Sequence, residues 1–423
     1  MWSTTAIGAP PCAAVGCMPS KALIEAANAF HRRLTFGEFA IQGAEGLRVD
    51  IPAVLARVRR MRDGFVKGPE SVPDKLGDRA VSGRARLLGP GWLEVNGDEI
   101  EVRAIILAPG SRPVVPGPWR NFGDRILTTD SLFEQDDLPR RIAVVGMGAI
   151  GVEMAQALAR LGLDVAGFDA AETLAGIDDR QVLEAFRPLI EAEIGLHTGA
   201  SAELEDAGGT IRVSGAGVVF EADAVLVTIG RRPNIDGLGL DTLGVALDDK
   251  GMPRIDPATL RIGDIQVFLA GDANGYRPLL HEAADEGHIA GRMAAPDSSD
   301  HGLCRRTALS IVFSSPQVAR VGPPLSDLDE GTTATGEADF SDQARPHGPD
   351  RRRLATRSRR ARDRAAPGRR DVCASRRTLG GPAGHAVLPS GAGGGSTPCT
   401  ARPCEGCGGR RWLGPVGLQS DGS

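Results

Sequence analysis

The stretch RIAVVGMGAIGVEMAQALARLGLDVAGFD, residues 141–169, decides the fold of this chain. It begins with an apolar, β-branched run, passes through three closely spaced glycines, and continues as an apolar segment with helical spacing. A second apolar run then ends at Asp169. This order predicts a strand, a glycine turn, a helix and a second strand, which is the repeating unit of a parallel doubly wound sheet.

The three glycines at the turn have the spacing GxGxxG, at Gly146, Gly148 and Gly151. In this position the first glycine permits a tight turn, the second lets a pyrophosphate approach the backbone, and the third lets helix and strand pack closely. The free amides at the helix N-terminus then face the phosphates. The stretch therefore predicts a dinucleotide-binding site.

The acidic residue that closes the unit, Asp169, lies eighteen positions after Gly151. A carboxylate at this place can accept a hydrogen bond from a ribose 2′-hydroxyl and repels a 2′-phosphate. No arginine stands in the following AAETLAG, so the sequence favours NAD over NADP. The alternative interpretation is an exposed aspartate in a loop.

Segments outside this unit extend the same pattern. Helical spacing runs from Cys12 to about Arg33 and from Ile51 to Phe65, and short alternating runs from Ala80 to Val102 predict antiparallel strands with glycine turns. Three more buried strands are expected in RAIILAPGSRP, ADAVLVTIG and IQVFLAGD. Strands that end on Gly-Arg or Gly-Asp and alternate with helices predict an α/β fold with parallel, doubly wound sheets.

Composition narrows the class of protein. A chain of 423 residues predicts two to four domains, and its net charge of −5 favours neither nucleic acid nor an anionic membrane as the main partner. The longest apolar run, residues 142–168, is interrupted by charged side chains, and the first residues lack the features of a signal peptide. A cytoplasmic location is therefore expected, where cysteines are more often catalytic, metal-binding or inert than disulfide staples.

Two cysteines, Cys12 and Cys17, stand five positions apart in CAAVGCMPSKAL, residues 12–23. They could be buried small residues, half of a zinc site, or a redox pair. A zinc site needs a second pair of ligands at matching spacing, which the nearby sequence does not offer. A disulfide across this spacing requires a distorted first helical turn and would be reducible, as a catalytic disulfide should be.

Six ordered motifs together make the chain resemble the pyridine nucleotide-disulfide oxidoreductases, a family of flavoproteins, over about residues 12–340. The motifs are CAAVGCMPSKAL, ILAPGSRP, VVGMGAIGVE, VTIGRRPN, VFLAGDANGYRPLLHEAADEG and IVFSSPQVARVG. The Pro-Ser-Lys step after Cys17 is similar to the dihydrolipoyl dehydrogenase branch. The resemblance implies FAD and NAD as cofactors, a small-molecule or lipoyl-type dithiol as substrate, and a homodimer.

The resemblance also implies roles for individual residues. Cys12 would attack the disulfide substrate and Cys17 would lie against the flavin ring, while Lys21 and Glu153 would pair near its reactive edge. A cation there would favour both the reduced flavin and a thiolate. Asp272 would hold the ribityl chain of FAD, with His281 in the next helix. The remaining expected cofactor-binding residues, beside the glycine turn and Asp169, are Gly110, Ser111, Gly230, Arg231 and Gly271.

The expected domains follow from this resemblance. They are two Rossmann-like nucleotide-binding domains, the FAD-binding one in two parts at 1–118 and 253–300 and the NAD-binding one at 119–252, then the start of an α+β dimerisation domain at 301–343, and a disordered tail at 344–423. The tail is rich in Arg, Gly and Pro and lacks apolar periodicity, so it cannot bury enough surface to offset its ordering entropy.

Both ends depart from the family pattern. Only MWSTTAIGAPP precedes Cys12, so the first strand, the phosphate turn and the ribose-binding acid of the FAD domain are expected to be absent. No His-Pro motif follows Phe340, and the change in composition near residue 344 resembles translation in a shifted frame. Ala108-Pro109-Gly110-Ser111 also replaces the family's Ala-Thr-Gly-Ser. The alternative hypotheses are a non-catalytic remnant and a mercuric-reductase-like enzyme.

The tail suggests two further ligands. Its arginine cluster, residues 351–370, has no interleaved aromatic residues, which argues against nucleic-acid binding. Cys404 and Cys407 have a C-x-x-C spacing, but no second ligand pair stands nearby, so no metal site is expected.

Overall fold

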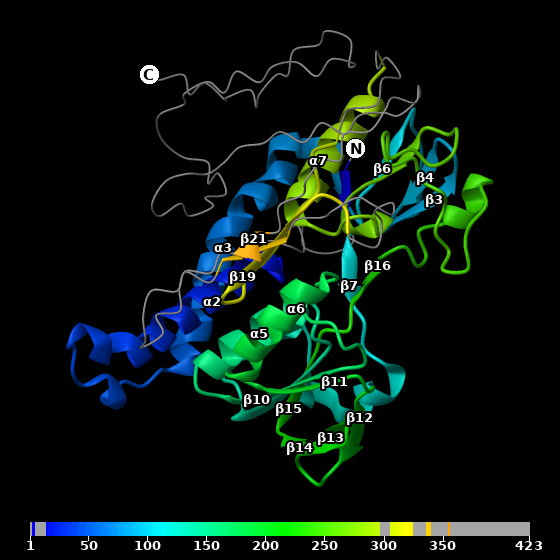
Figure 1. Cartoon of the computed structure of the whole chain (residues 1–423). Coiled ribbons are helices and arrows are strands. Elements are labelled where there is room, and N and C mark those ends of the chain that lie inside the picture. Colours follow the sequence, from blue (N-terminus) through cyan, green and yellow to red (C-terminus); the bar gives the residue numbers. More distant parts are fainter. Residues whose placement is uncertain (1, 5–13, 297–304, 325–335, 340–353, 356–423) are drawn as a thin grey trace, which may run out of the picture. The chain divides into compact units, whose positions relative to one another are not determined.

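The computed structural model describes residues 2–4, 14–296, 305–324, 336–339 and 354–355 (Figure 1). The expected glycine-turn unit is present as strand β9 (Arg141–Val145), helix α5 (Ala149–Arg160) and strand β10 (Asp164–Asp169). These strands belong to a five-stranded parallel sheet in the order β11-β10-β9-β15-β8. The other three strands are β8 (Ile126–Leu127), β11 (Gly195–Thr198) and β15 (Ala224–Val227).

The two faces of this sheet bury alternate residues of each strand, as a pleated strand requires. One face, with Ile142 and Val144, packs on α5 and on helix α6 (Arg180–Glu191). The other face, with Ala143 and Val145, packs on a three-stranded antiparallel sheet that the sequence analysis did not predict. That sheet comprises β12 (Glu203–Asp206), β13 (Ile211–Gly215) and β14 (Val218–Ala222), and Figure 1 shows it on the side opposite α5 and α6.

The elements of the expected FAD-binding region come from both ends of the described chain. Helix α2 (Cys17–His31) and helix α3 (Ile51–Leu76) pack on each other, and the second is longer than its apolar spacing predicted. Strand β6 (Ile105–Leu107) pairs in parallel with β17 (Val267–Leu269), which is followed by helix α7 (Leu280–Met293). The expected antiparallel strands are present as β3 (Ala85–Gly89), β4 (Trp92–Val95) and β5 (Asp98–Glu101).

Two short strands lie where the chain enters and leaves the five-stranded sheet. Strand β7 (Ser111–Pro113) pairs antiparallel with β16 (Arg231–Pro233), and the short helix α4 (Thr129–Leu132) follows β8. The remaining described helices are short 3₁₀ segments: η1 (Arg32–Phe39), η2 (Ala44–Gly46), η3 (Gly77–Arg79), η4 (Gly117–Arg125), η5 (Leu240–Leu243) and η6 (Gly271–Asn274).

The structure describes short strands near both ends of the chain. At the N-terminus, β1 (Trp2–Thr4) pairs in parallel with β2 (Ala80–Ser82) through backbone hydrogen bonds that need no particular side chain. The phosphate turn expected to be absent would follow such a strand, and residues 5–13 lie outside the described residues. Strand β21 (Leu354–Ala355) falls inside the segment expected to be disordered, because its backbone adds to the edge of β20 (Gly336–Asp339).

The C-terminal described sheet has the order β18-β19-β20-β21, with β18 at Leu309–Val312 and β19 at Gln317–Val321. It lies where the dimerisation domain was expected to begin. Residues 356–423, which include the Cys404 and Cys407 pair and most of the arginine cluster, lie outside the described residues. Among the helices that the structure describes, none is long and apolar enough to cross a membrane.

Candidate functional site

The glycine turn between β9 and α5 is shaped by close backbone contacts. A Cβ added to Gly151 would lie 1.8 Å from the carbonyl oxygen of Gly146, and one added to Gly146, whose φ is +99°, would lie 2.6 Å from the carbonyl oxygen of Thr228. At Gly148 an added Cβ would meet nothing within 4 Å. The first and third glycines are therefore needed by the fold itself, whereas the second leaves open space in front of the helix N-terminus, where the sequence analysis expects a pyrophosphate.

Asp169, at the end of β10, is tied to this turn. One carboxylate oxygen accepts a hydrogen bond from the backbone N–H of Met147, and the other accepts one from the N–H of Ala171 at 2.8 Å. Each oxygen keeps a second lone pair, so the carboxylate can also accept a ribose hydroxyl. Asp169 thus braces the turn in addition to its expected contact with the cofactor.

Cys17 is the first residue of α2 and is half-buried and disulfide-bonded. Gly16 precedes the helix with a non-helical backbone, and the Ser20 hydroxyl donates to the Cys17 carbonyl at 3.0 Å. A helix N-terminus stabilises a thiolate through the positive end of its dipole. Cys12 lies outside the described residues.

Lys21 and Glu153 meet although 132 positions separate them in the sequence. The Lys21 Nζ donates to Glu153 Oε2 at 2.7 Å, and the Glu153 side chain is only 5% exposed. The other carboxylate oxygen accepts the backbone N–H of Phe313 at 2.8 Å, and Lys21 Nζ lies 4.5 Å from the centre of the Phe313 ring. Lys21 stands four positions after Cys17 in α2, so the two residues lie on the same face of the helix. The Lys21–Glu153 ion pair therefore lies near Cys17.

Ser111, Arg231 and Asp272 form a second group. The Ser111 hydroxyl donates to Asp272 Oδ2 at 2.9 Å and accepts from Arg231 Nε at 2.8 Å. The same guanidinium donates to the Ser111 carbonyl, to the Thr129 hydroxyl and to Asp130. Strands β7 and β16, the η6 turn and α4 therefore meet at this point. Within the described residues Asp272 Oδ1 accepts no hydrogen bond, so this oxygen can accept one from a ligand.

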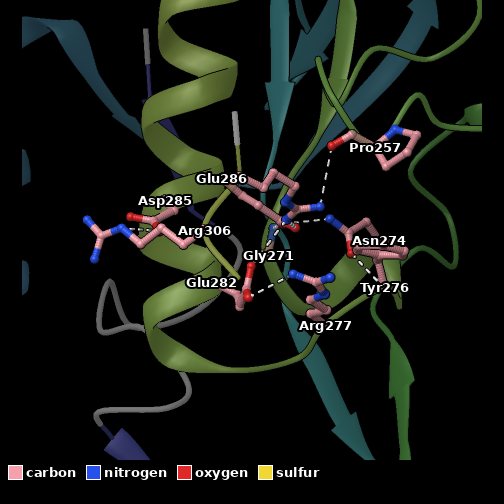
Figure 2. A network of polar contacts seen from close by, with 10 residues as sticks. Pro257, Gly271, Asn274, Tyr276, Arg277, Glu282, Asp285, Glu286 and Arg306 are labelled. Carbon is pink, nitrogen blue, oxygen red and sulfur yellow. Dashed lines mark hydrogen bonds and ion pairs between the residues drawn. The ribbon is translucent and has the colours of Figure 1, made fainter. Parts of the chain in front are cut away.

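The turn that carries Asp272 is held by Glu286 of α7, which is fully buried. Its Oε2 accepts the backbone N–H of Gly271 at 2.7 Å and the amide of Asn274 at 2.6 Å, and its Oε1 pairs with Arg305. Figure 2 shows the carboxylates of Glu282 and Glu286 facing this turn, with Arg277 beside Glu282. This network fixes the backbone at Gly271, whose φ is +72°.

The remaining expected residues are less connected. Gly110 and Gly230 both have positive φ, of 71° and 119°, and their carbonyls accept the backbone N–H groups of Asn234 and Val114. His281 is exposed in the first turn of α7. The sequence analysis missed the partners Thr228, Glu286 and Arg305, of which Glu286 is fully buried, because only the folded topology brings them to the site.

A surface cavity of about 640 Å³ lies elsewhere, between β3, β4 and the loop 235–251. None of the expected site residues lines it, so the candidate site rests on the contacts above and not on this hollow. Within the described residues, no group of three or more His, Cys, Asp or Glu side chains is placed to hold a metal ion.

Comparison with known proteins gives consistent matches. The family model described as pyridine nucleotide-disulphide oxidoreductase matches residues 3–287. Dihydrolipoyl dehydrogenase of Chlamydia pneumoniae is 30% identical over 321 residues, which cover 74% of this chain and 68% of that protein. The enzyme of the same name from Thermus scotoductus is 31% identical over 330 residues, with the same two coverages of 74% and 68%.

Solved structures agree with the fold. The crystal structure of LpdA from Mycobacterium tuberculosis is 26% identical, with a TM-score of 0.69, and covers 79% of this chain and 75% of that one. The HOCl-induced flavoprotein disulfide reductase RclA from Escherichia coli is 21% identical, with a TM-score of 0.65 and coverages of 77% and 71%, which is a likeness of fold alone.

Proposed function

Since the chain belongs to the pyridine nucleotide-disulphide oxidoreductase family, whose members work with FAD and NAD(H), we propose that it oxidises a dithiol of the lipoyl type through Cys12 and Cys17. Two substrate thiols would become a disulfide, NAD⁺ would take up a hydride, and one proton would be released. In this scheme the Cys12 and Cys17 disulfide is reduced by exchange with the substrate and is then reoxidised.

The residues present fit both cofactors in part. The open space at Gly148 and the bracing of the turn by Asp169 suit NAD, and the Asp272 carboxylate, fixed by Ser111, suits a polyol chain such as that of FAD. FAD, when bound, supplies the step that converts a two-electron thiol oxidation into hydride transfer.

The observation that carries the proposal is the Lys21–Glu153 ion pair. It joins α2, which begins at Cys17, to α5, which follows the glycine turn, so these two helices are held side by side. The Lys21 ammonium would favour the thiolate of Cys17 and negative charge on the neighbouring cofactor. Glu153, in turn, keeps that ammonium in place.

A homodimer and a lipoyl-type substrate are part of the same proposal, through the relatives named dihydrolipoyl dehydrogenase. Light scattering on the purified chain would test the dimer directly. A mass equal to one chain at micromolar concentration would contradict it.

The experiment for the reaction is NAD⁺ reduction by dihydrolipoamide, followed for the FAD-loaded chain and for the variant Cys17→Ser. We expect measurable turnover for the unmodified chain and a loss of at least about a thousandfold for the variant, because thiol exchange needs both sulfurs. Glu184→Gln, at an exposed position of α6, serves as a control, with unchanged turnover expected. Equal rates for Cys17→Ser and the unmodified chain would overturn the proposal.

A further inference from the structure

A second polar contact joins the same two helices two turns further along. Arg160 of α5 donates from Nη1 to the side-chain oxygen of Asn28 on α2 at 2.6 Å. Asn28 stands seven positions after Lys21, and Arg160 stands seven positions after Glu153. Equal spacing on both helices means that they run side by side in one register, with a polar contact at each end.

Arg160 is held by the carboxylate of Glu193. The Arg160 side chain is 5% exposed, and its guanidinium binds Glu193 through two bonds, Nε to Oε2 at 2.6 Å and Nη2 to Oε1 at 2.7 Å. Glu193 also accepts the Gln156 amide at 2.8 Å. The pair is therefore bidentate and fully hydrogen-bonded, the geometry in which an arginine fixes direction as well as distance.

The helix α5 also grips a third segment. The Gln156 side chain accepts the backbone N–H of Ser315 at 2.7 Å and donates to its carbonyl at 2.8 Å, while Glu153 accepts the N–H of Phe313. Gln156 is 3% exposed. Residues of α5 thus hold both helix α2 and the backbone of Phe313 and Ser315.

We infer that Arg160 and Glu193 are positioning residues that set the register of α5 against α2 and so hold Glu153 on Lys21. Desolvation offsets much of the attraction in a buried ion pair, and an apolar pair of similar volume often stabilises a fold equally well. The contribution of Arg160 and Glu193 is therefore to placement rather than to stability. The inference rests on the proposed function for its effect on turnover and on the described contacts alone for its effect on geometry.

The test uses the FAD-loaded full chain with the double variant Arg160→Met and Glu193→Met, which keeps the volume and leaves no buried charge unpaired. We expect a folded protein whose kcat for dihydrolipoamide falls at least tenfold while the KM for NAD⁺ changes less than twofold. The single variant Arg160→Lys keeps the charge without the planar fork and should recover part of kcat. Arg180→Met, which removes the exposed pair with Glu184, is the matched control and should match the unmodified chain.

A crystal structure of the double variant supplies a readout independent of activity. We expect the distance between Lys21 Nζ and Glu153 to exceed 4 Å as α5 shifts along α2. A distance near the present 2.7 Å, in a variant with unchanged kcat, would overturn the inference. If the unmodified chain itself shows no turnover, the proposed function fails, and the distance in the variant alone decides whether Arg160 and Glu193 set the register.

Discussion

Two regions of the molecule are held together by different means: the one expected to bind NAD, residues 119–252 (the NAD side), and the one expected to bind FAD, residues 1–118 and 253–300 (the flavin side). The NAD side has five parallel strands whose alternate residues enter two apolar cores, one under α5 and one above β13. The flavin side has two short parallel pairs among the described residues, β1 with β2 and β6 with β17, and the turn at Asp272 is held by the buried side chains of Ser111 and Glu286. In a five-stranded sheet, each strand is positioned by hydrogen bonds to its neighbours. A two-stranded pair has few such bonds, so the nearby turn depends on a few polar contacts between distant segments.

This difference predicts where single substitutions do the most damage. On the NAD side the most damaging substitutions should be those that disturb close backbone contacts. The largest effect is expected for Gly151→Val, because its Cβ would overlap the Gly146 carbonyl, which cannot move without breaking the turn. We expect the free energy of unfolding to fall by about 3 kcal/mol or more and NADH binding to be lost. Urea unfolding and NADH fluorescence titration would measure both.

Gly148→Ala is the matched control on the same turn. Its added Cβ meets nothing within 4 Å, so the free energy of unfolding should change by about 0.5 kcal/mol or less, while the NADH dissociation constant rises. If Gly151→Val unfolded at the same urea concentration as the unmodified chain, the view of the NAD side as fixed by backbone contacts would be wrong.

On the flavin side the largest effect should come from a buried charge. Glu286→Gln keeps the volume but removes the negative charge that faces Arg305, and it replaces an acceptor of the Gly271 N–H. We expect about 2 kcal/mol less stability and weaker FAD binding, with NADH binding unchanged. Glu184→Gln, an exposed member of an i,i+4 pair, should leave all three quantities unaltered. Equal losses for both cofactors would erase the distinction between the two regions.

A smaller effect is expected at the hydroxyl that joins the two regions. Ser111→Ala removes one bond to Asp272 and one from Arg231, but both partners keep other contacts or solvent. Stability should fall by about 1 kcal/mol, and the FAD dissociation constant should rise. Ser71→Ala, which removes a hydroxyl bond within the exposed part of α3, provides the comparison. An unchanged FAD affinity in Ser111→Ala would mean that Asp272 is held without it.

The smallest effect is a pH dependence at His31, which ends α2 beside Arg160. Burial, and then the positive charge of Arg160, lower the pKa of His31 from its ordinary value of 6.5, while Glu193 opposes this shift. The folded protein therefore binds this proton less readily than the unfolded chain, and its stability should decline as the pH falls below about 6.5. The free energy of unfolding of His31→Gln, minus that of the unmodified chain, should therefore increase as the pH is lowered from 8 to 5.5. A constant difference over that range would contradict the assignment.

The sequence predicted the NAD side in detail because its elements are local. The glycine turn, the helix after it and Asp169 stand within one stretch of 29 residues, 141–169. The apolar periodicity of that stretch is enough to predict its strands and its helix. The sheet β12–β14 was missed because its strands are only four or five residues long and mostly not buried, so they carry a weak apolar alternation. The charged residue Arg160 inside an apolar helix was a signal of a buried partner, but Glu193 and Asn28 become neighbours only through the fold.

The flavin side was predicted through resemblance rather than periodicity. The contact of Ser111 with Asp272 joins positions 161 residues apart, and that of Lys21 with Glu153 joins positions 132 apart, so no local pattern could report either. The roles assigned to Cys12, Cys17 and the cofactor-binding residues stay predictions. The expected loss of the first glycine-rich turn of the FAD domain also stays a prediction, because residues 5–13 lie outside the described residues.

The most direct test of the central claim is the visible absorption spectrum of the purified chain with FAD supplied, titrated with dithiothreitol and then with NADH. If the chain is a flavin-dependent disulfide oxidoreductase, the bound-flavin spectrum should change in two stages, with a long-wavelength band after the thiols are reduced and bleaching after NADH is added. Cys17→Ser should lose the first stage and keep the second. A chain that remains colourless after FAD is supplied and unbound FAD is removed would contradict the account.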